Sequence, residues 1–193
     1  MKTKTLLFLL LLSTSFSFSQ TLKELKEVTK KIYDANYNMD FDAITQLSYP
    51  KMVETIGKDK FLEKLDTDYQ NQEFRMRLEL LAPLFQYDMV QKIGGKSYSI
   101  VTYKNPTRYF FEAKLNETTS AQKVASLKEN NTTQDVTFEP KRNSINVKRT
   151  SKFIAIADET TGNQWKFINW DDLKQRELFE TIFGSELKKQ LGL

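Results

Sequence analysis

The spacing of hydrophobic residues changes once along this chain, near residue 70. From Leu22 to Met39 the apolar residues recur every three or four positions, which is the spacing of one helical face. From Phe74 to Leu80 they alternate strictly with Arg and Glu, which is the two-residue repeat of a strand with one buried face. Helices followed by strands, without an alternating strand and helix order, are typical of an α+β domain.

Further helices are predicted on both sides of the strand region. Asp40 has the right side chain and position to cap a second helix, and Gly57 is a plausible end for a third. Another helical face follows at residues 61–69. Residues 173–183 repeat the helical spacing, and Gly184 is expected to end that C-terminal helix.

The middle of the chain is predicted to be rich in strands. Gly94 and Gly95 are placed to form a tight hairpin turn, because glycine accepts the positive φ angles that such a turn needs. Residues 115–135 are polar and lack a period, so we expect a loop with one helical turn around Val124 and Leu127. The predicted strands are Tyr87–Lys92, Ser97–Tyr103, Thr107–Ala113, Val136–Glu139, Ile145–Thr150, Phe153–Asp158 and Gln164–Asn169.

The first 19 residues have the pattern of a secretory signal peptide. Lys2 and Lys4 precede the apolar run Leu6–Leu12, and the run is followed by a cleavage site of the small-x-small kind at residues 17–19. The apolar run is too short to span a bilayer. We therefore expect a single domain over residues 20–193, exported to the periplasm or the cell exterior.

The composition excludes several kinds of chemistry. The chain has no His and no Cys, so imidazole bases, thiolate nucleophiles and zinc sites built on nitrogen or sulfur are excluded. No cysteine is present to carry a lipid anchor, and no cofactor or metal is expected. Removing Lys2 and Lys4 lowers the formal net charge from +4 to +2, which gives no reason to expect a nucleic-acid partner.

Three features resemble a known family. The opening pair of helices, the glycine hairpin at residues 92–98, and above all the strand-turn-strand sequence of residues 153–158 and 165–168 are similar to secreted members of the nuclear transport factor 2-like superfamily. This resemblance implies N-terminal helices packed on a strongly curved antiparallel sheet, forming a cone with an apolar pocket. Some members of that superfamily are enzymes, and many only bind ligands. Its enzymes commonly use His, or Asp paired with Tyr, and this chain has no His.

Aromatic residues supply the candidate ligand-binding site. They share an aromatic body with a polar tip, which suits a flat or amphipathic ligand, and they fall on elements that a curved sheet would bring together. The same residues also suit the rim of an ordinary core. The set is Tyr33, Tyr37, Tyr87, Tyr98, Tyr103 and Trp165.

Charged residues provide three further candidates. Asp158 is the one catalytic candidate, as a carboxylate whose pKa is raised by burial beside a Tyr, although turn formation is the simpler explanation of its place. The alternating oxygen side chains of residues 34–42 lack the Gly and Glu of a calcium loop. A basic cluster could meet an anionic surface, and more often such a cluster is a solvated face. It comprises Lys141, Arg142, Lys148, Arg149 and Lys152.

These observations favour an exported, non-catalytic binding or accessory domain. The expected partner is a small apolar or aromatic ligand or a protein, and the sequence is also compatible with a homodimer. The alternatives are a small proton-transfer enzyme, an isomerase or lyase with a carboxylate-tyrosine site, and a structural module of the cell envelope.

Overall fold

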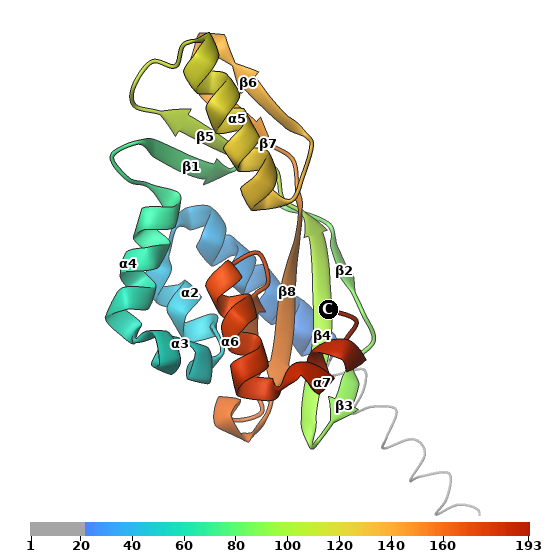
Figure 1. Ribbon diagram of the computed structural model, residues 1–193. Coiled ribbons are helices and arrows are strands. Elements are labelled where there is room, and N and C mark those ends of the chain that lie inside the picture. Colours follow the sequence, from blue (N-terminus) through green and yellow to red (C-terminus); the bar gives the residue numbers. More distant parts are fainter. Residues whose placement is uncertain (1–21) are drawn as a thin grey trace, which may run out of the picture.

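The chain begins with helices, continues mainly with strands and ends with helices in the computed structural model, which describes residues 22–193 (Figure 1). The predicted α+β class is confirmed, with antiparallel pairing throughout the named strands of this range. The signal peptide expected at residues 1–19 lies outside the described residues. Within residues 22–193, no helix combines the length and the apolar character that crossing a membrane requires.

The N-terminal helices begin and end near the predicted positions. The first helix covers residues 22–38 and ends at Met39, whose φ of 59° is left-handed. Asp40 then caps the next helix by accepting a hydrogen bond of 3.0 Å from the backbone N–H of Ala43, as predicted. Gly57, with a φ of 89°, separates the last two helices of this region. These helices are α2 (Phe41–Leu47), α3 (Pro50–Ile56) and α4 (Lys58–Tyr69).

A five-stranded sheet forms the middle of the molecule. Its long strands are β4 (Lys96–Lys104) and β8 (Thr150–Ala157), and all of β8 pairs with residues 97–104 of β4. Gly94 and Gly95 form the predicted hairpin turn, with φ angles of 57° and 79°. The prediction of one continuous strand over residues 87–92 is wrong, because residues 88–90 belong to no strand and separate two short strands, although the N–H of Asp88 still donates to the carbonyl of Ile100 at 2.9 Å. The outer strands are β2 (Phe85–Tyr87), β3 (Gln91–Ile93) and β9 (Lys166–Asn169).

A four-stranded sheet meets the end of the first sheet. Its order is β1 (Phe74–Leu78), β5 (Thr107–Phe111), β7 (Ser144–Val147) and β6 (Val136–Glu139). The chain passes from β4 to β5 at residues 105–106, and from β7 to β8 at residues 148–149. Pro106 has no backbone N–H to donate, and the N–H of Asn105 donates to the carbonyl of Arg149 at 2.8 Å. The strand predicted over residues 145–150 is therefore wrong at its end, since Thr150 already belongs to β8.

The polar segment expected to be a loop is a helix instead. Residues Glu117–Asn131 form α5, which packs against the four-stranded sheet through Val124 and Leu127, and Leu115 joins the same cluster from the segment just before the helix. A capping box holds its first turn, in which Asn116 and Thr119 each accept a hydrogen bond from the other's backbone. The helix was missed because its buried face is so narrow that its hydrophobic residues show no helical period.

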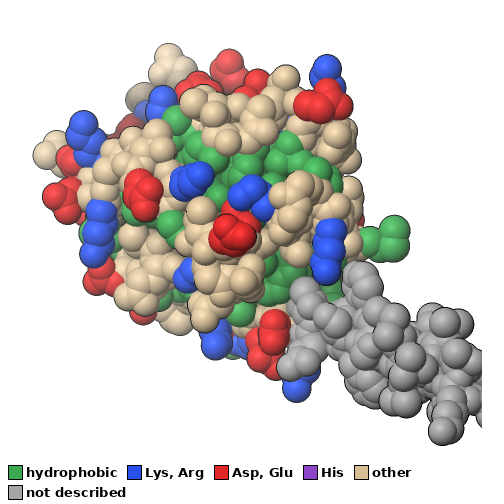
Figure 2. Space-filling view, turned by 90° about the horizontal axis from the view of Figure 1, so that it is seen from below, with side chains coloured by type: hydrophobic (Ala, Val, Ile, Leu, Met, Phe, Trp, Pro, Cys, Tyr) green, Lys and Arg blue, Asp and Glu red, His purple; other side chains and the backbone are tan. Residues whose placement is uncertain are grey.

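Helices lie against both faces of the five-stranded sheet, and a hydrophobic cluster fills each interface (Figure 1). The helix of residues 22–38, α2 and α4 supply side chains to the cluster on one face. The other face packs against α3 and the C-terminal helices α6 (Leu173–Phe183) and α7 (Ser185–Gln190). Trp165 and Phe167 belong to the first cluster, whereas Ile168 and Trp170 belong to the second, as the alternation in β9 predicts. Figure 2 shows that hydrophobic side chains also reach the surface at the lower end of the molecule, among acidic and basic ones.

Candidate functional site

A cavity of about 680 Å³ lies where α4, α5 and the start of α6 face the four-stranded sheet. Its volume is within the range of pockets that hold small molecules. Its lining combines aromatic side chains with polar and charged ones. We call this cavity the aromatic pocket. Its aromatic side chains are Tyr69, Phe74, Tyr103, Tyr109, Phe111 and Phe153.

Strand pairing places most of these rings. In β1 and β5, Phe74 lies opposite Phe111 and Met76 lies opposite Tyr109. Side chains two residues apart share one face of a strand, so these four point to the same side of the sheet. The rings of Phe74 and Tyr109 are 5.1 Å apart in an edge-to-face contact. Tyr69 joins them from the last turn of α4.

Arg149 is the central charged group of the lining. It lies at the break between β7 and β8 and belongs to neither strand, and its backbone carbonyl accepts the hydrogen bond from Asn105 described above. Its Nη1 donates to Oδ1 of Asn131 at 2.5 Å, and its Nε lies 3.8 Å from Oδ2 of Asp171. The hydroxyl of Tyr69, another lining residue, donates to Oδ1 of Asn36 at 2.9 Å.

Burial keeps the tyrosine hydroxyls of the pocket protonated. It is the largest influence on Tyr69, Tyr103 and Tyr109, and it raises the pKa of each above the ordinary value of 10.0. The positive charge of Arg149 lowers these pKa values only in part. Near neutral pH the three side chains are therefore neutral rings with a polar tip, and none of them can act as a base.

A second cavity, of about 800 Å³, lies on the other side of Arg149. The two cavities share Asn130, Asn131, Arg149 and Asp171, so these residues form the wall between them. We call this second cavity the cationic groove. Of the basic cluster singled out in the sequence, Lys148, Arg149 and Lys152 line it, whereas Lys141 and Arg142 lie outside its lining, in the turn Pro140–Arg142.

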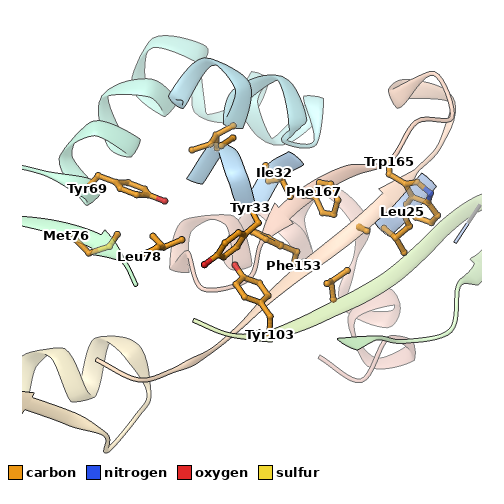
Figure 3. Close-up of a cluster of buried hydrophobic side chains, with 14 residues drawn as sticks. Leu25, Ile32, Tyr33, Tyr69, Met76, Leu78, Tyr103, Phe153, Trp165 and Phe167 are labelled. Carbon is orange, nitrogen blue, oxygen red and sulfur yellow. The ribbon is translucent and has the colours of Figure 1, made fainter. Parts of the chain in front are cut away.

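The predicted aromatic set is divided between the core and the pocket. Of its six members, only Tyr103 lines the aromatic pocket. Figure 3 shows the ring of Tyr33 turned toward that of Tyr103, and the two ring centroids are 5.6 Å apart. Trp165 is buried in the same core cluster, and Tyr37 and Tyr87 pack at its edge. Tyr98 belongs to the cluster on the opposite face of the sheet.

Asp158 is buried beside a tyrosine, as the enzyme hypothesis requires, but its pKa moves in the opposite direction. Its Oδ2 accepts hydrogen bonds from Tyr49 at 2.9 Å and from the ammonium group of Lys96 at 2.8 Å. Burial acts to raise the pKa, and hydrogen bonds from Lys96, Thr160 and Tyr49 outweigh it, so the pKa falls to about 2. The expectation of a raised pKa is therefore wrong.

The remaining contacts of Asp158 explain its position. Its side chain accepts from the backbone N–H of Thr161, and the hydroxyl of Thr161 accepts in return from the backbone N–H of Asp158. This capping box holds the turn between β8 and β9. The turn explanation fits these bonds, and a carboxylate that stays ionised is a poor proton acceptor near neutral pH.

Carboxylates at residues 34–42 have roles within the helices. Asp40 is the helix cap described above, and Asp34 forms an ion pair with Lys30 one turn earlier, at 2.5 Å. Within residues 22–193, no three acidic, His or Cys side chains converge as metal ligands would.

The sequence did not identify Tyr69, Tyr109 or Asp171 as pocket residues. The alternation of Tyr109 and Phe111 in β5, on the same face as the apolar residues of β1, was the available signal for two of the rings. No protein-family model matches this chain, and searches of characterised proteins and of solved structures find no match either. The two cavities are therefore the features from which a function can be inferred.

Proposed function

We propose that this chain is an exported, non-catalytic binding domain of the nuclear transport factor 2-like kind, and that its aromatic pocket takes a small apolar or aromatic ligand. The observation that carries the proposal is the cavity of about 680 Å³ lined by tyrosine and phenylalanine rings. Flat aromatic walls with neutral polar tips suit a ligand of the same character.

The proposed cone consists of the two sheets acting as one sharply bent sheet. Strands β4 and β8 continue into β5 and β7 across two breaks, and the bond from Asn105 to Arg149 joins these breaks. The pocket lies where α4, α5 and the start of α6 approach the bend. A pocket between helices and the concave side of a bent sheet is what the family resemblance implies.

The charges around the aromatic pocket favour an uncharged ligand. Lys64 lies between two carboxylates, with its Nζ 2.5 Å from Asp68 and 2.9 Å from Asp172. Arg149 lies beside Asp171, with its Nε 3.8 Å from Oδ2 of that carboxylate. Because these positive groups are already paired, a ligand gains little from carrying a charge of its own.

The proposed export of the protein rests on the predicted signal peptide. The charged, apolar and cleavage regions of residues 1–19 support a route to the periplasm or the cell exterior. No cofactor is part of the proposal. The enzyme alternative is less well supported, because the carboxylate at Asp158 is held ionised and lines neither cavity.

A fluorescence titration tests the proposal. The full chain is titrated with the neutral dye Nile red, and the same titration is run on Ser126→Trp and Ala125→Trp. Ser126 lines the pocket from α5, whereas its exposed neighbour Ala125 does not line it, so the two variants add the same side chain to the same helix.

We expect saturable dye binding that Ser126→Trp abolishes and Ala125→Trp leaves unchanged, with both variants keeping the melting temperature of the parent. Binding that survives Ser126→Trp, or no binding by the parent to any small apolar probe, would refute the pocket proposal. The second outcome would favour the structural envelope module instead.

A protein partner is the second candidate, and one feature supports it. The link between β1 and the edge strand β2 exposes Leu81 and Leu84, whose side chains are 71% and 90% exposed, and Met89, just after β2, is 87% exposed. Exposed apolar groups next to a sheet edge are typical of interaction surfaces.

Sedimentation of the full chain tests whether the partner is a second copy of this chain. A dimer that Leu84→Asp dissociates would support the homodimer, and a monomer at all concentrations would exclude it.

A further inference from the structure

The cationic groove carries an excess of positive charge. Its volume is about 800 Å³, and it lies at the bend between the two sheets, between the end of α5 and the start of α6. Five basic side chains line it against only two acidic ones, Asp135 and Asp171. The basic side chains are Lys104, Lys148, Arg149, Lys152 and Arg176.

Pairing within the groove accounts for only two of these positive charges. Lys148 lies 3.4 Å from Asp135, and Arg149 lies 3.8 Å from Asp171. For the side chains of Lys104, Lys152 and Arg176, the described part of the chain offers no hydrogen-bond or ion-pair partner. Three unpaired positive charges in one groove repel each other, and an anion bound between them would remove that repulsion.

Two arginine side chains that line the cationic groove also have N–H donors without a hydrogen-bond acceptor in the described part of the chain. The Nε atoms of Arg149 and Arg176 are buried, and neither has a hydrogen-bond partner among residues 22–193. Arginine presents its N–H groups as a planar fork that matches the oxygens of phosphate. Because a buried donor without a partner is costly, a small rotation of either side chain toward an oxyanion would gain a bond that the protein alone does not make.

One feature of the groove acts against an anion. The C-terminal end of α5 reaches the groove at Asn131 and Thr132, and a helix C-terminus carries roughly half a negative charge. The three unpaired side chains outweigh this partial charge several times. The exposed hydroxyl of Thr132 adds a neutral donor on the same wall.

We propose that the cationic groove binds a phosphate group, either as free phosphate or as part of a phosphorylated small molecule. Phosphate carries about 1.5 to 2 negative charges near neutral pH, and it therefore fits an excess of three unpaired cations better than a single carboxylate does. This site goes beyond the aromatic pocket, because it lies on the other side of the wall formed by Arg149 and Asp171.

Isothermal titration calorimetry on the full chain tests this proposal with three probes: inorganic phosphate, glycerol 3-phosphate and acetate. We expect both phosphates to bind saturably and acetate to bind at least tenfold more weakly. Tighter binding of glycerol 3-phosphate would identify a phosphorylated small molecule as the ligand, and equal binding would identify free phosphate. Absence of phosphate binding, or acetate binding of equal strength, would overturn the proposal.

Matched variants separate a specific site from general attraction to a basic protein. Lys104→Gln combined with Lys152→Gln removes two unpaired charges from the groove. Lys51→Gln combined with Lys141→Gln removes two exposed lysines outside the groove lining, so the net charge changes equally. We expect the first pair to weaken phosphate binding by about tenfold or more and the second to leave it within about twofold.

The comparison of the two pairs decides between these explanations. Equal losses in both pairs would show that attraction is unspecific and would refute the groove site. The dye titration with Ser126→Trp reports on the aromatic pocket separately, so failure of one site leaves the test of the other intact. A melting curve of each variant confirms that the titrated protein is folded.

Discussion

Stability at acid pH depends on Asp158. This side chain is 2% exposed and joins β8 to α3 and β4 through Tyr49 and Lys96. Its pKa in the folded protein is about 2, against 3.8 for the unperturbed group. A difference of this size corresponds to about 2 kcal/mol of folding free energy, because one pKa unit is worth about 1.4 kcal/mol.

The direction of the pH dependence follows from the lowered pKa. Above pH 3.8 the carboxylate is ionised in both states, and its full contribution is present. As the pH falls from 3.8 toward 2, the unfolded chain takes up the proton first, so the contribution is progressively lost. Replacing the carboxylate by an amide should therefore destabilise the protein near neutral pH and have little effect near pH 2.

Urea denaturation of the parent, Asp158→Asn and Glu159→Gln between pH 2 and pH 7 measures this effect. Glu159 is the exposed neighbour, and its replacement removes the same charge without touching the buried contacts. We expect Asp158→Asn to cost about 2 kcal/mol at pH 7 and almost nothing at pH 2, and Glu159→Gln to cost little throughout. A cost for Asp158→Asn that stays constant over this range would refute the assigned pKa shift.

Three further substitutions test the core and one helix cap. Trp165→Ala removes a side chain that is 3% exposed and should cost about 3–5 kcal/mol in urea denaturation, so an unchanged midpoint would contradict its burial. Asn116→Ala removes the cap of α5 and should cost about 1 kcal/mol, with a matching small loss of helical circular dichroism. Tyr33→Phe removes a hydrogen bond of 2.5 Å to the carbonyl of Leu80 and should cost about 1 kcal/mol, while a stabilised variant would contradict that bond.

The sequence predicted the elements whose residues repeat with a clear period. The strand over residues 136–139 has its predicted bounds, and Asp40 and Gly57 begin and end helices where expected. Alternation of apolar residues also predicted the two faces of β9. The helical spacing of apolar residues did not reveal α5, because that helix depends on the capping box of Asn116 and Thr119 and buries few apolar side chains.

The pocket was harder to predict, because it depends on distant segments that meet where the two sheets join. Tyr103 was identified on its strand, but Tyr69 comes from α4 and Tyr109 from the second sheet. Arg149 faces the pocket only because the pairing of β7 stops at Val147 and β8 starts at Thr150. Spacing along the chain does not encode where a sheet breaks, so contacts across the break are beyond a local pattern.

The most direct test of the central claim is to see which tyrosine rings respond to a bound aromatic molecule. The full chain with labelled tyrosine rings is titrated with indole and followed by nuclear magnetic resonance. The aromatic pocket predicts that the signals of Tyr69 and Tyr109 shift with a common affinity, while those of Tyr49 and Tyr98 in the opposite core cluster stay in place. Shifts confined to Tyr49 and Tyr98, or spread equally over all rings, would contradict the pocket.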